Sequence, residues 1–275
     1  NQAIANKLPS TLSILTMGRT FYGSIRGTGT NKSDILADRL PSLTQLDLSR
    51  GGGQHFHPDN DDKDDGTNIQ CTIPNLGQYV TNVNLNHNDF RKFARTDSAN
   101  HRYNIKDLPR LQTLNLYGNY YLNDSYWNGS AYATLGIGNG FSASNSLTYI
   151  DVGNTNLPMI NCSGQTNLTE YRHYNMRPST SFFVNPAANY AGGDAYTSYR
   201  FSNCSSLNVF YFHHANISGP FPKFNHPELT DIDLHWTDMS GLGPDGSLDS
   251  DKNFVIPKDT FEGCPKLRSF YFWNN

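Results

Sequence analysis

The sequence predicts an elongated repeat fold, a solenoid of mostly β or α/β type, in which short parallel strands stack into one curved sheet of about nine rungs. Three observations predict it. A short apolar pattern recurs nine times along the 275 residues, short and long spacings between the copies alternate, and the apolar content of 36% is low. Low apolar content suits a stack of rungs, because each rung buries its face only against its neighbours and leaves much surface in water.

The pattern is clearest at 111–119, which reads LQTLNLYGN. Leu111, Leu114 and Leu116 occupy its first, fourth and sixth places, where a short strand and its entry would bury them. Asn119 occupies the ninth place, where we expect its side chain to bond backbone groups that the turn leaves unpaired. The first, fourth and sixth places of the nine copies hold Leu12/Leu15/Met17, Leu43/Leu46/Leu48, Val80/Val83/Leu85, Leu111/Leu114/Leu116, Leu147/Ile150/Val152, Leu168/Tyr171/His173, Leu207/Phe210/Phe212, Leu229/Ile232/Leu234 and Leu267/Phe270/Phe272.

This L-x-x-L-x-L-x-x-N pattern resembles the leucine-rich-repeat superfamily. The resemblance implies a leucine-rich-repeat solenoid, a curved stack of parallel strands used mostly for recognition and not for catalysis. Residues 201–207 and 261–267 both read F-x-x-C-x-x-L. These two rungs resemble the bacterial surface-antigen class of such repeats, whose members act in adhesion.

Spacings between leading residues range from 21 to 39, but taken two at a time from the first they sum to 68, 67, 60 and 60, so the larger unit is a pair of rungs. We therefore predict a single solenoid domain over 1–275, with long insertions between the strands. The insertions are rich in Gly, Pro, Asn and Asp, which predicts loops and turns and not a second domain, with one short helix around 91–96. They lie at 51–75, 89–109, 120–145, 177–206 and 240–265.

Charge and hydropathy exclude two classes of partner. The net charge is −3 with mixed signs, so no nucleic-acid partner is expected. The sequence contains no run of about 18 apolar residues, so insertion into a membrane is not expected. Neither end of the stack shows a polar cap, and we expect the ends to be covered by the rest of a larger protein or by assembly partners. Loops rich in Asn, Ser, Thr and Gly favour an extracellular or virion-surface location.

The outward strand places predict the binding surface. The third, fifth, seventh and eighth places of each rung would face the concave side, and in the C-terminal half these places are aromatic and charged. An ordinary solvated strand face is the alternative, but exposed Trp236 and Trp273 favour binding, because large aromatic side chains are rarely left in water without use. The predicted binding residues are Tyr174, Tyr211, His213, His214, Asp233, His235, Trp236, Tyr271 and Trp273.

No metal ion or other cofactor is predicted. His213 and His235 share a column on adjacent rungs, and strands about 4.8 Å apart would let both imidazoles approach one ion. Asp233 lies on the same face, but no third fixed ligand is evident. The acidic run 59–66 does not fit a calcium loop, because Lys63 stands at a ligand position and Thr72 stands where a Glu would close the site.

Motifs of catalysis are also missing from the sequence. It contains no G-x-S-x-G, H-E-x-x-H, P-loop or dinucleotide fingerprint. The leading hypothesis is therefore a non-enzymatic recognition or assembly module, binding a protein partner or receptor as part of an extracellular surface or phage virion structural protein. The alternative is a carbohydrate-binding adhesin module that takes a surface glycan. A polysaccharide-acting enzyme built in the insertions is a third hypothesis.

The four cysteines are expected to be free thiols. Cys204 and Cys264 share a column two rungs apart, about 10 Å, beyond the roughly 7 Å that a disulfide allows between Cα atoms. Cys71 and Cys162 fall in other columns. At the sixth place of its rung, His173 should be buried, neutral and hydrogen-bonded.

Overall fold

The computed structural model describes most of the predicted rungs and parts of the insertions. The described residues are 8–17, 35–49, 72–88, 90–94, 96, 98–127, 131–141, 144–175, 180–184, 196–218, 221–237, 256 and 259–275. The acidic run 59–66 and Cys71 lie outside these ranges, as does most of the last insertion.

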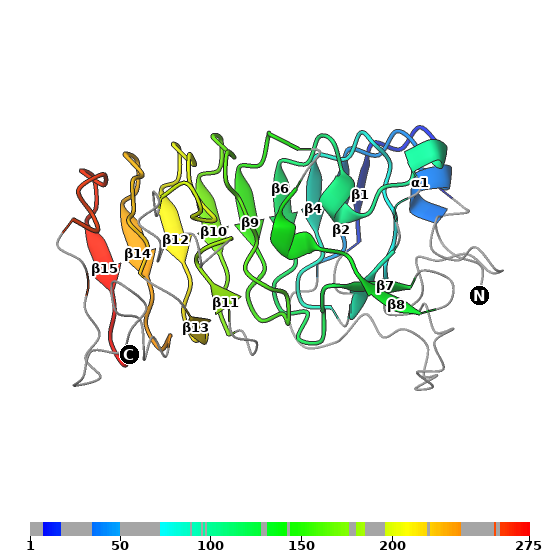
Figure 1. The fold of residues 1–275 in the computed structure, drawn as a ribbon. Helices are drawn as coiled ribbons and strands as arrows, with labels where there is room; N and C mark the ends of the chain where they lie inside the picture. The colour runs from blue at the N-terminus through cyan, green and yellow to red at the C-terminus, as the bar shows by residue number, and fades with distance from the viewer. Residues whose placement is uncertain are drawn as a thin grey trace. The chain divides into compact units, whose positions relative to one another are not determined.

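The chain divides into two compact units, and each contains part of the predicted strand series (Figure 1). The first comprises Asn1–Ile137, Phe141–Ser144 and Thr155–Leu157, and the second comprises Gly138–Gly140, Asn145–Asn154 and Pro158–Asn275. The leading strands of the first unit are β1 (Ile14–Thr16), β2 (Gln45–Asp47), β4 (Asn82–Asn84) and β6 (Thr113–Asn115). Those of the second are β9 (Tyr149–Asp151), β10 (Glu170–Arg172), β12 (Val209–Tyr211), β14 (Asp231–Asp233) and β15 (Ser269–Tyr271).

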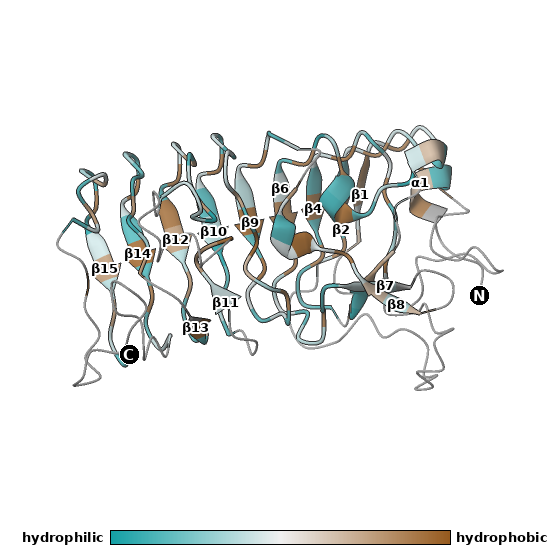
Figure 2. Ribbon diagram, in the orientation of Figure 1, coloured by the Kyte–Doolittle hydropathy of each residue, from teal (hydrophilic) through white to brown (hydrophobic). Residues whose placement is uncertain are grey.

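The strands pair in parallel with the register that the repeat predicts. In the first unit the fourth-place residues pair in series, Leu15 with Leu46, Leu46 with Val83, and Val83 with Leu114. The second unit continues the rule with Ile150–Tyr171, Tyr171–Phe210, Phe210–Ile232 and Ile232–Phe270. Figure 2 shows the hydrophobic segments recurring from strand to strand. The nine strands at these offsets confirm a leucine-rich-repeat type of fold.

The core changes in character along the chain. Leucine dominates the first unit, where Leu46, Leu114 and Leu116 are fully buried. In the second unit the fully buried side chains are largely aromatic, and they include Tyr171, Phe182, Tyr199, Phe201, Phe210, Phe212 and Phe224. His173 lies within this core, with Nδ1 2.9 Å from the hydroxyl of Tyr171. The predicted burial and hydrogen bonding of His173 are confirmed.

Asn119 bonds to backbone as its place in the repeat predicts. Its Nδ2 donates to the carbonyl oxygens of Leu116 and Leu85, at 2.7 and 2.9 Å, and its Oδ1 accepts the N–H of Phe90 at 3.1 Å. Asn88 serves the preceding rung in the same way, since its Nδ2 donates to the carbonyls of Leu85 and Leu48. Each ninth-place Asn thus joins two neighbouring rungs.

A tight turn leads into β10, β12, β14 and β15 of the second unit. The N–H of the leading residue donates to the carbonyl three residues earlier, as in Leu207 to Cys204 and Leu267 to Cys264, both at 3.1 Å. The F-x-x-C-x-x-L motif therefore places a small apolar side chain at the start of this turn. Cys162, Cys204 and Cys264 are buried and free, which confirms the prediction for these three.

The insertions hold more regular structure than the predicted loops. In the first unit β3 (Thr72–Ile73), β5 (Lys92–Phe93), β7 (Ser125–Trp127) and β8 (Tyr132–Thr134) form a four-stranded sheet. In the second unit β11 (Thr180–Ser181) pairs with β13 (Ile217–Ser218). The predicted helix around 91–96 is wrong, because Lys92 and Phe93 form β5. Stacked rungs bring equivalent return segments side by side, where their backbone groups pair, and Phe93 is buried.

The helices are short. Those within the described residues are α1 (Ile35–Arg39), η2 (Ser98–Asn100), η3 (Ile105–Asp107) and η4 (Ile137–Asn139). Within the described ranges, none has the length and apolar character that crossing a membrane requires.

Candidate functional site

The nine predicted binding residues all lie in the second unit, in or just after β10, β12, β14 and β15. We call them the aromatic–histidine surface: Tyr174, Tyr211, His213, His214, Asp233, His235, Trp236, Tyr271 and Trp273. Trp273, Trp236 and Tyr271 are 53%, 49% and 49% exposed. The expected exposure of the large aromatic residues is therefore present, whereas Tyr174, Tyr211, His213, Asp233 and His235 are half-buried.

Side chains at the seventh place stack into one column of rings. The ring centroids are 4.6 Å apart for Tyr174–His213, 4.3 Å for His213–His235 and 4.6 Å for His235–Trp273, and the paired planes lie within 14° of parallel. In-register parallel strands repeat every 4.8 Å or so, which sets planar side chains face to face. Gly153 precedes the column, and a Cβ there would lie 2.8 Å from the Tyr174 ring. The absence of a side chain at Gly153 therefore lets that ring lie close to the backbone.

The eighth place of the rung adopts a left-handed backbone. In the second unit φ is 54° at Asn154, 58° at Asn175, 52° at His214 and 54° at Trp236. Gly and Asn tolerate this conformation, whereas a bulky side chain there is strained. Trp236 nevertheless occupies it, half-exposed, with its ring stacked on that of His214 at 5.5 Å and 4°. The left-handed turn recurs from rung to rung, so what sets Trp236 apart is a bulky, exposed aromatic side chain at a place that favours Gly or Asn.

Fifth-place carboxylates and amides have a structural role. Asp47, Asn84, Asn115, Asp151 and Asp233 each accept the backbone N–H two residues later, at 2.8 to 3.4 Å. This Asx turn ends the five leading strands that carry Asp or Asn at the fifth place. Asp47 and Asp151 each have a second side-chain partner, the amide of Asn84 and the hydroxyl of Tyr149, whereas Oδ1 of Asp233 also contacts an imidazole, at Nδ1 of His235. That contact favours the tautomer of His235 that carries its proton on Nδ1 and leaves Nε2 as the lone-pair nitrogen.

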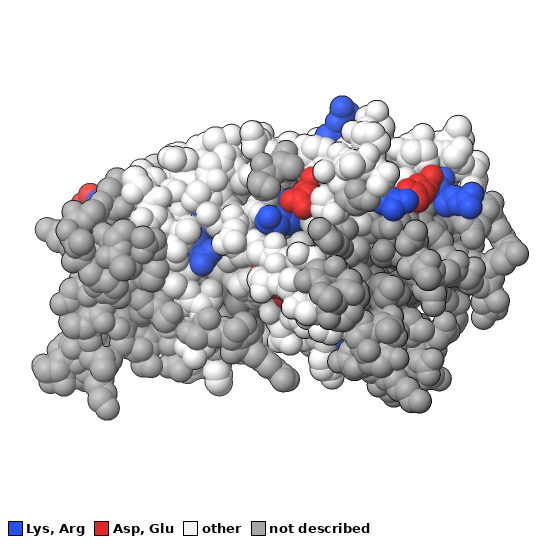
Figure 3. Space-filling model, turned by 45° about the vertical axis from the view of Figure 1, so that its right-hand side comes forward, with Lys and Arg blue, Asp and Glu red and all other residues white. Residues whose placement is uncertain are grey.

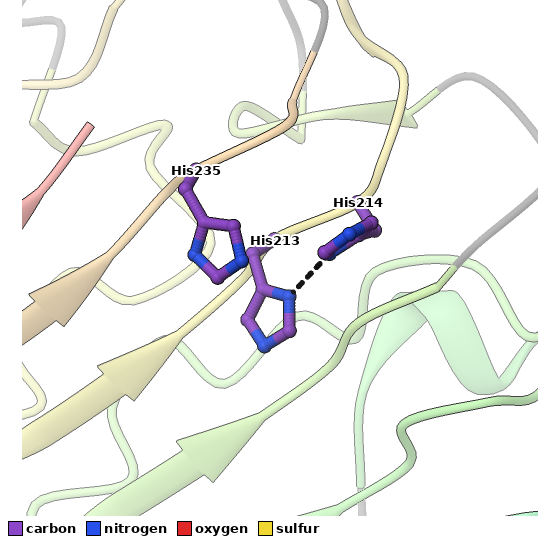
Figure 4. A group of neighbouring side chains, drawn as sticks. All are labelled: His213, His214 and His235. Carbon is purple, nitrogen blue, oxygen red and sulfur yellow. Dashed lines mark hydrogen bonds between the residues drawn. The ribbon is translucent and has the colours of Figure 1, made fainter. Parts of the chain in front are cut away.

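Three imidazoles gather at this place (Figure 4). Nδ1 of His213 and Nδ1 of His214 are 2.8 Å apart, and the His214 ring stands at 82° to that of His235. Burial lowers the pKa of His213 to about 4, opposed by Asp233 and reinforced by His235 and His214. Burial, and then His235, also lowers the pKa of His214. Both rings are therefore neutral at pH 7.

A second candidate site lies in the first unit. A cleft of about 700 Å³ is lined by Arg91, Lys92, Tyr121, Asn123, Ser125, Tyr132 and Asn156. The guanidinium of Arg91 lies 5.3 Å from the centroid of the Tyr121 ring, and Nζ of Lys92 lies 4.2 Å from that of Tyr132. On the face in Figure 3 the charged side chains of the described residues are scattered and form no large patch of one sign. The cleft therefore combines two cationic side chains, Arg91 and Lys92, with two tyrosine rings.

Sequence reasoning missed this cleft. Arg91 and Lys92 belong to the predicted insertion 89–109, whereas Tyr121 and Tyr132 come from the next one, 120–145. The two segments meet because β5 pairs with β7, and β7 with β8. Strands this short carry no periodic signal in the sequence.

Comparison with known proteins gives distant likenesses. No family model matches the chain, and no curated protein matches it. Among solved structures it is similar to the plant peptide hormone receptor RGFR1 in complex with RGF2, at 16% identity and a TM-score of 0.49, over 85% of this chain and 29% of the receptor chain. It is also similar to an internalin, InlF, from Listeria monocytogenes, at 14% identity and a TM-score of 0.42, over 97% of this chain and 68% of that one. The chain thus spans less than a third of the receptor chain, and the assignment of a leucine-rich-repeat type of fold rests on the register of its own strands.

Proposed function

We propose that the chain is a non-enzymatic recognition module that binds a protein partner through the aromatic–histidine surface. Residues 1–275 would form a single solenoid domain of an extracellular or virion-surface protein. The observation that supports it most is the stacked column ending in Trp273, with Trp236 strained and exposed beside it. Trp and Tyr are the residues that most often supply the binding free energy of protein interfaces.

The stacking favours binding for a second reason. Side chains that are already ordered lose less conformational entropy when a partner covers them. The rings of Tyr174, His213 and His235 are held between neighbours, and Trp236 is held against His214. The surface therefore offers large apolar area in a fixed arrangement, with polar ring nitrogens at its edges.

Selection from a displayed peptide library on the intact chain tests the proposal. Affinities of the selected peptides for the wild-type protein and its variants would be measured by titration calorimetry. We expect Trp236→Ala and Trp273→Ala each to cost about 2 kcal/mol or more, roughly a 30-fold loss of affinity. Tyr120→Ala is the control, because Tyr120 is 54% exposed and belongs to the first unit. If the selected peptides bind all variants with equal affinity, the binding site does not lie on this surface.

Carbohydrate binding is the second candidate function, and the cleft of the first unit favours it. Exposed Tyr121 and Tyr132 provide faces for a sugar ring, while Arg91 and Lys92 provide cations for a carboxylate on that sugar. An acidic oligosaccharide should bind more tightly than its neutral counterpart of the same linkage, and Arg91→Ala or Tyr121→Ala should weaken that binding about tenfold. Trp236→Ala should leave it unchanged. Equal binding of acidic and neutral oligosaccharides would exclude this function for the cleft.

A further inference from the structure

We propose that His213, His214 and His235 bind a divalent transition-metal ion of the zinc class. Neutral imidazole is a preferred ligand of such ions, and three protein ligands with an open fourth position are a common arrangement for zinc. The proposal does not depend on protein recognition by the same surface, because metal binding needs no partner.

The geometry brings three ligand atoms together. One ring nitrogen from each histidine lies within 4.8 Å of one from each of the others. Two imidazole nitrogens about 2.05 Å from a tetrahedral zinc ion are about 3.3 Å apart. Nδ1 of His213 and Nδ1 of His214 are already 2.8 Å apart and would face the ion together after a small separation. The rings of His213 and His235 are nearly parallel, so one of them must rotate about its side-chain bonds to share that ion.

The left-handed backbone supplies the third ligand. His213 and His235 share a column, as the sequence indicates, but His214 follows His213 directly and would point elsewhere in a continuing strand. At φ of 52° the chain turns, and the imidazole of His214 lies edge-on to both other rings, at 69° and 82°. The third ligand, missing from the sequence pattern, is therefore produced by the left-handed turn that recurs at the eighth place in the part of the chain that the structure describes.

Asp233 orients one of the ligands. Metal-binding histidines commonly donate their second ring N–H to a carboxylate, which fixes the tautomer and raises the basicity of the ligating nitrogen. Asp233 stands in this relation to His235, and its own position is fixed by the backbone N–H that it accepts at 3.2 Å. Its negative charge would also offset part of the charge of the ion.

Zinc titration of the intact chain, prepared without a polyhistidine tag, tests the site. Calorimetry at neutral pH should show one Zn²⁺ ion per chain, and Co²⁺ should give the intense visible absorption of tetrahedral coordination. His214→Asn is the most informative variant, because Asn tolerates the left-handed backbone. The matched control is His87→Asn, since His87 occupies the eighth place of a first-unit rung with φ of 52°. We expect His214→Asn and His235→Asn to abolish measurable binding, and His87→Asn to leave affinity and stoichiometry unchanged.

Asp233→Asn separates a metal site from incidental binding to surface histidines. The substitution keeps an oxygen that can accept the N–H of His235 but removes the carboxylate charge, so affinity should fall by roughly 10- to 100-fold. Far-UV circular dichroism and the midpoint of thermal unfolding, both without metal, would show that the variants fold. Should His235→Asn fail to fold, His214→Asn decides, because His214 is exposed. The proposal is overturned if the wild-type chain binds no zinc, or if His87→Asn weakens binding as much as His214→Asn does.

Discussion

At the scale of residues, several polar side chains that stand out in the sequence form hydrogen bonds with the backbone. Asp151 is 6% exposed and accepts the N–H of Gly153 at 3.0 Å, and burial raises its pKa. Its equivalents in other rungs make the same turn, so a carboxylate at the fifth place does not by itself indicate a site. Asp233 differs because an imidazole lies against it. The kind of second partner, an imidazole and not an amide or a hydroxyl, distinguishes Asp233 from Asp47 and Asp151.

His226 predicts a pH dependence of stability. It is fully buried, its Nδ1 donates to the carbonyl of Cys204 at 3.2 Å, and its Nε2 has no hydrogen-bond partner within the described residues. Burial lowers its pKa to about 4. The groups around it, Tyr196, Tyr199, Cys204 and Cys264, carry no charge at acidic pH. A neutral imidazole is thus what this environment stabilises.

Between about pH 6.5 and pH 4 the unfolded chain binds a proton at His226 that the folded chain does not. The contribution of His226 is therefore complete above pH 6.5 and is lost as the pH falls toward 4, in total about 3 kcal/mol. Urea unfolding of the wild type and of His226→Gln over this range would measure it. Gln can still donate to the Cys204 carbonyl but does not titrate, so the variant should lose less stability on acidification. Identical pH profiles would contradict the prediction.

At the scale of elements, the leading strands could be predicted and the return strands could not. A leading strand places three apolar side chains in fixed order, and nine copies define the register of each, so Phe210 and Ile232 were paired correctly from the sequence. A return strand such as β5 has only two residues. Its backbone pairs because a neighbouring rung presents a partner, which local sequence does not record. The cleft that contains Arg91 and Tyr121 depends on that pairing, and was missed for this reason.

The left-handed turn after the strands could have been predicted from the sequence. Gly118, Asn154 and Asn175 all occupy the eighth place, and these residue types indicate a left-handed backbone. His87, His214 and Trp236 at the same place obscured the rule. Recognising it would have placed the His214 imidazole beside the column, and with it the third ligand of the proposed metal site.

At the scale of the whole molecule, the two units are built on one repeat but differ in core chemistry. The first unit buries mainly leucine and other aliphatic side chains, whereas the second packs rings together, with Phe210 stacked on Tyr171 at 5.9 Å and edge-on to Phe201 at 4.9 Å. Aromatic side chains are larger than leucine and bury more area. Their abundance on the inner face of the second unit matches the abundance of rings on its outer face, so composition alone could not separate core from site. The period of the repeat separates them.

The prediction that 1–275 is a single domain can be tested by asking whether the two units unfold together. Asn119→Ala in the first unit removes three hydrogen bonds to buried backbone groups and should cost about 3 kcal/mol. Phe210→Ala in the second unit empties a fully buried ring site and should cost about 3–5 kcal/mol.

Native-state hydrogen exchange read by mass spectrometry reports the opening free energy of each unit separately. In one cooperative domain, each substitution lowers the opening free energy of the most protected amides in both units by the same amount. Tyr120→Ala, an exposed substitution, should change neither unit by more than about 0.5 kcal/mol. If Asn119→Ala weakens protection only in the first unit, and Phe210→Ala only in the second, the chain consists of two independently folding domains.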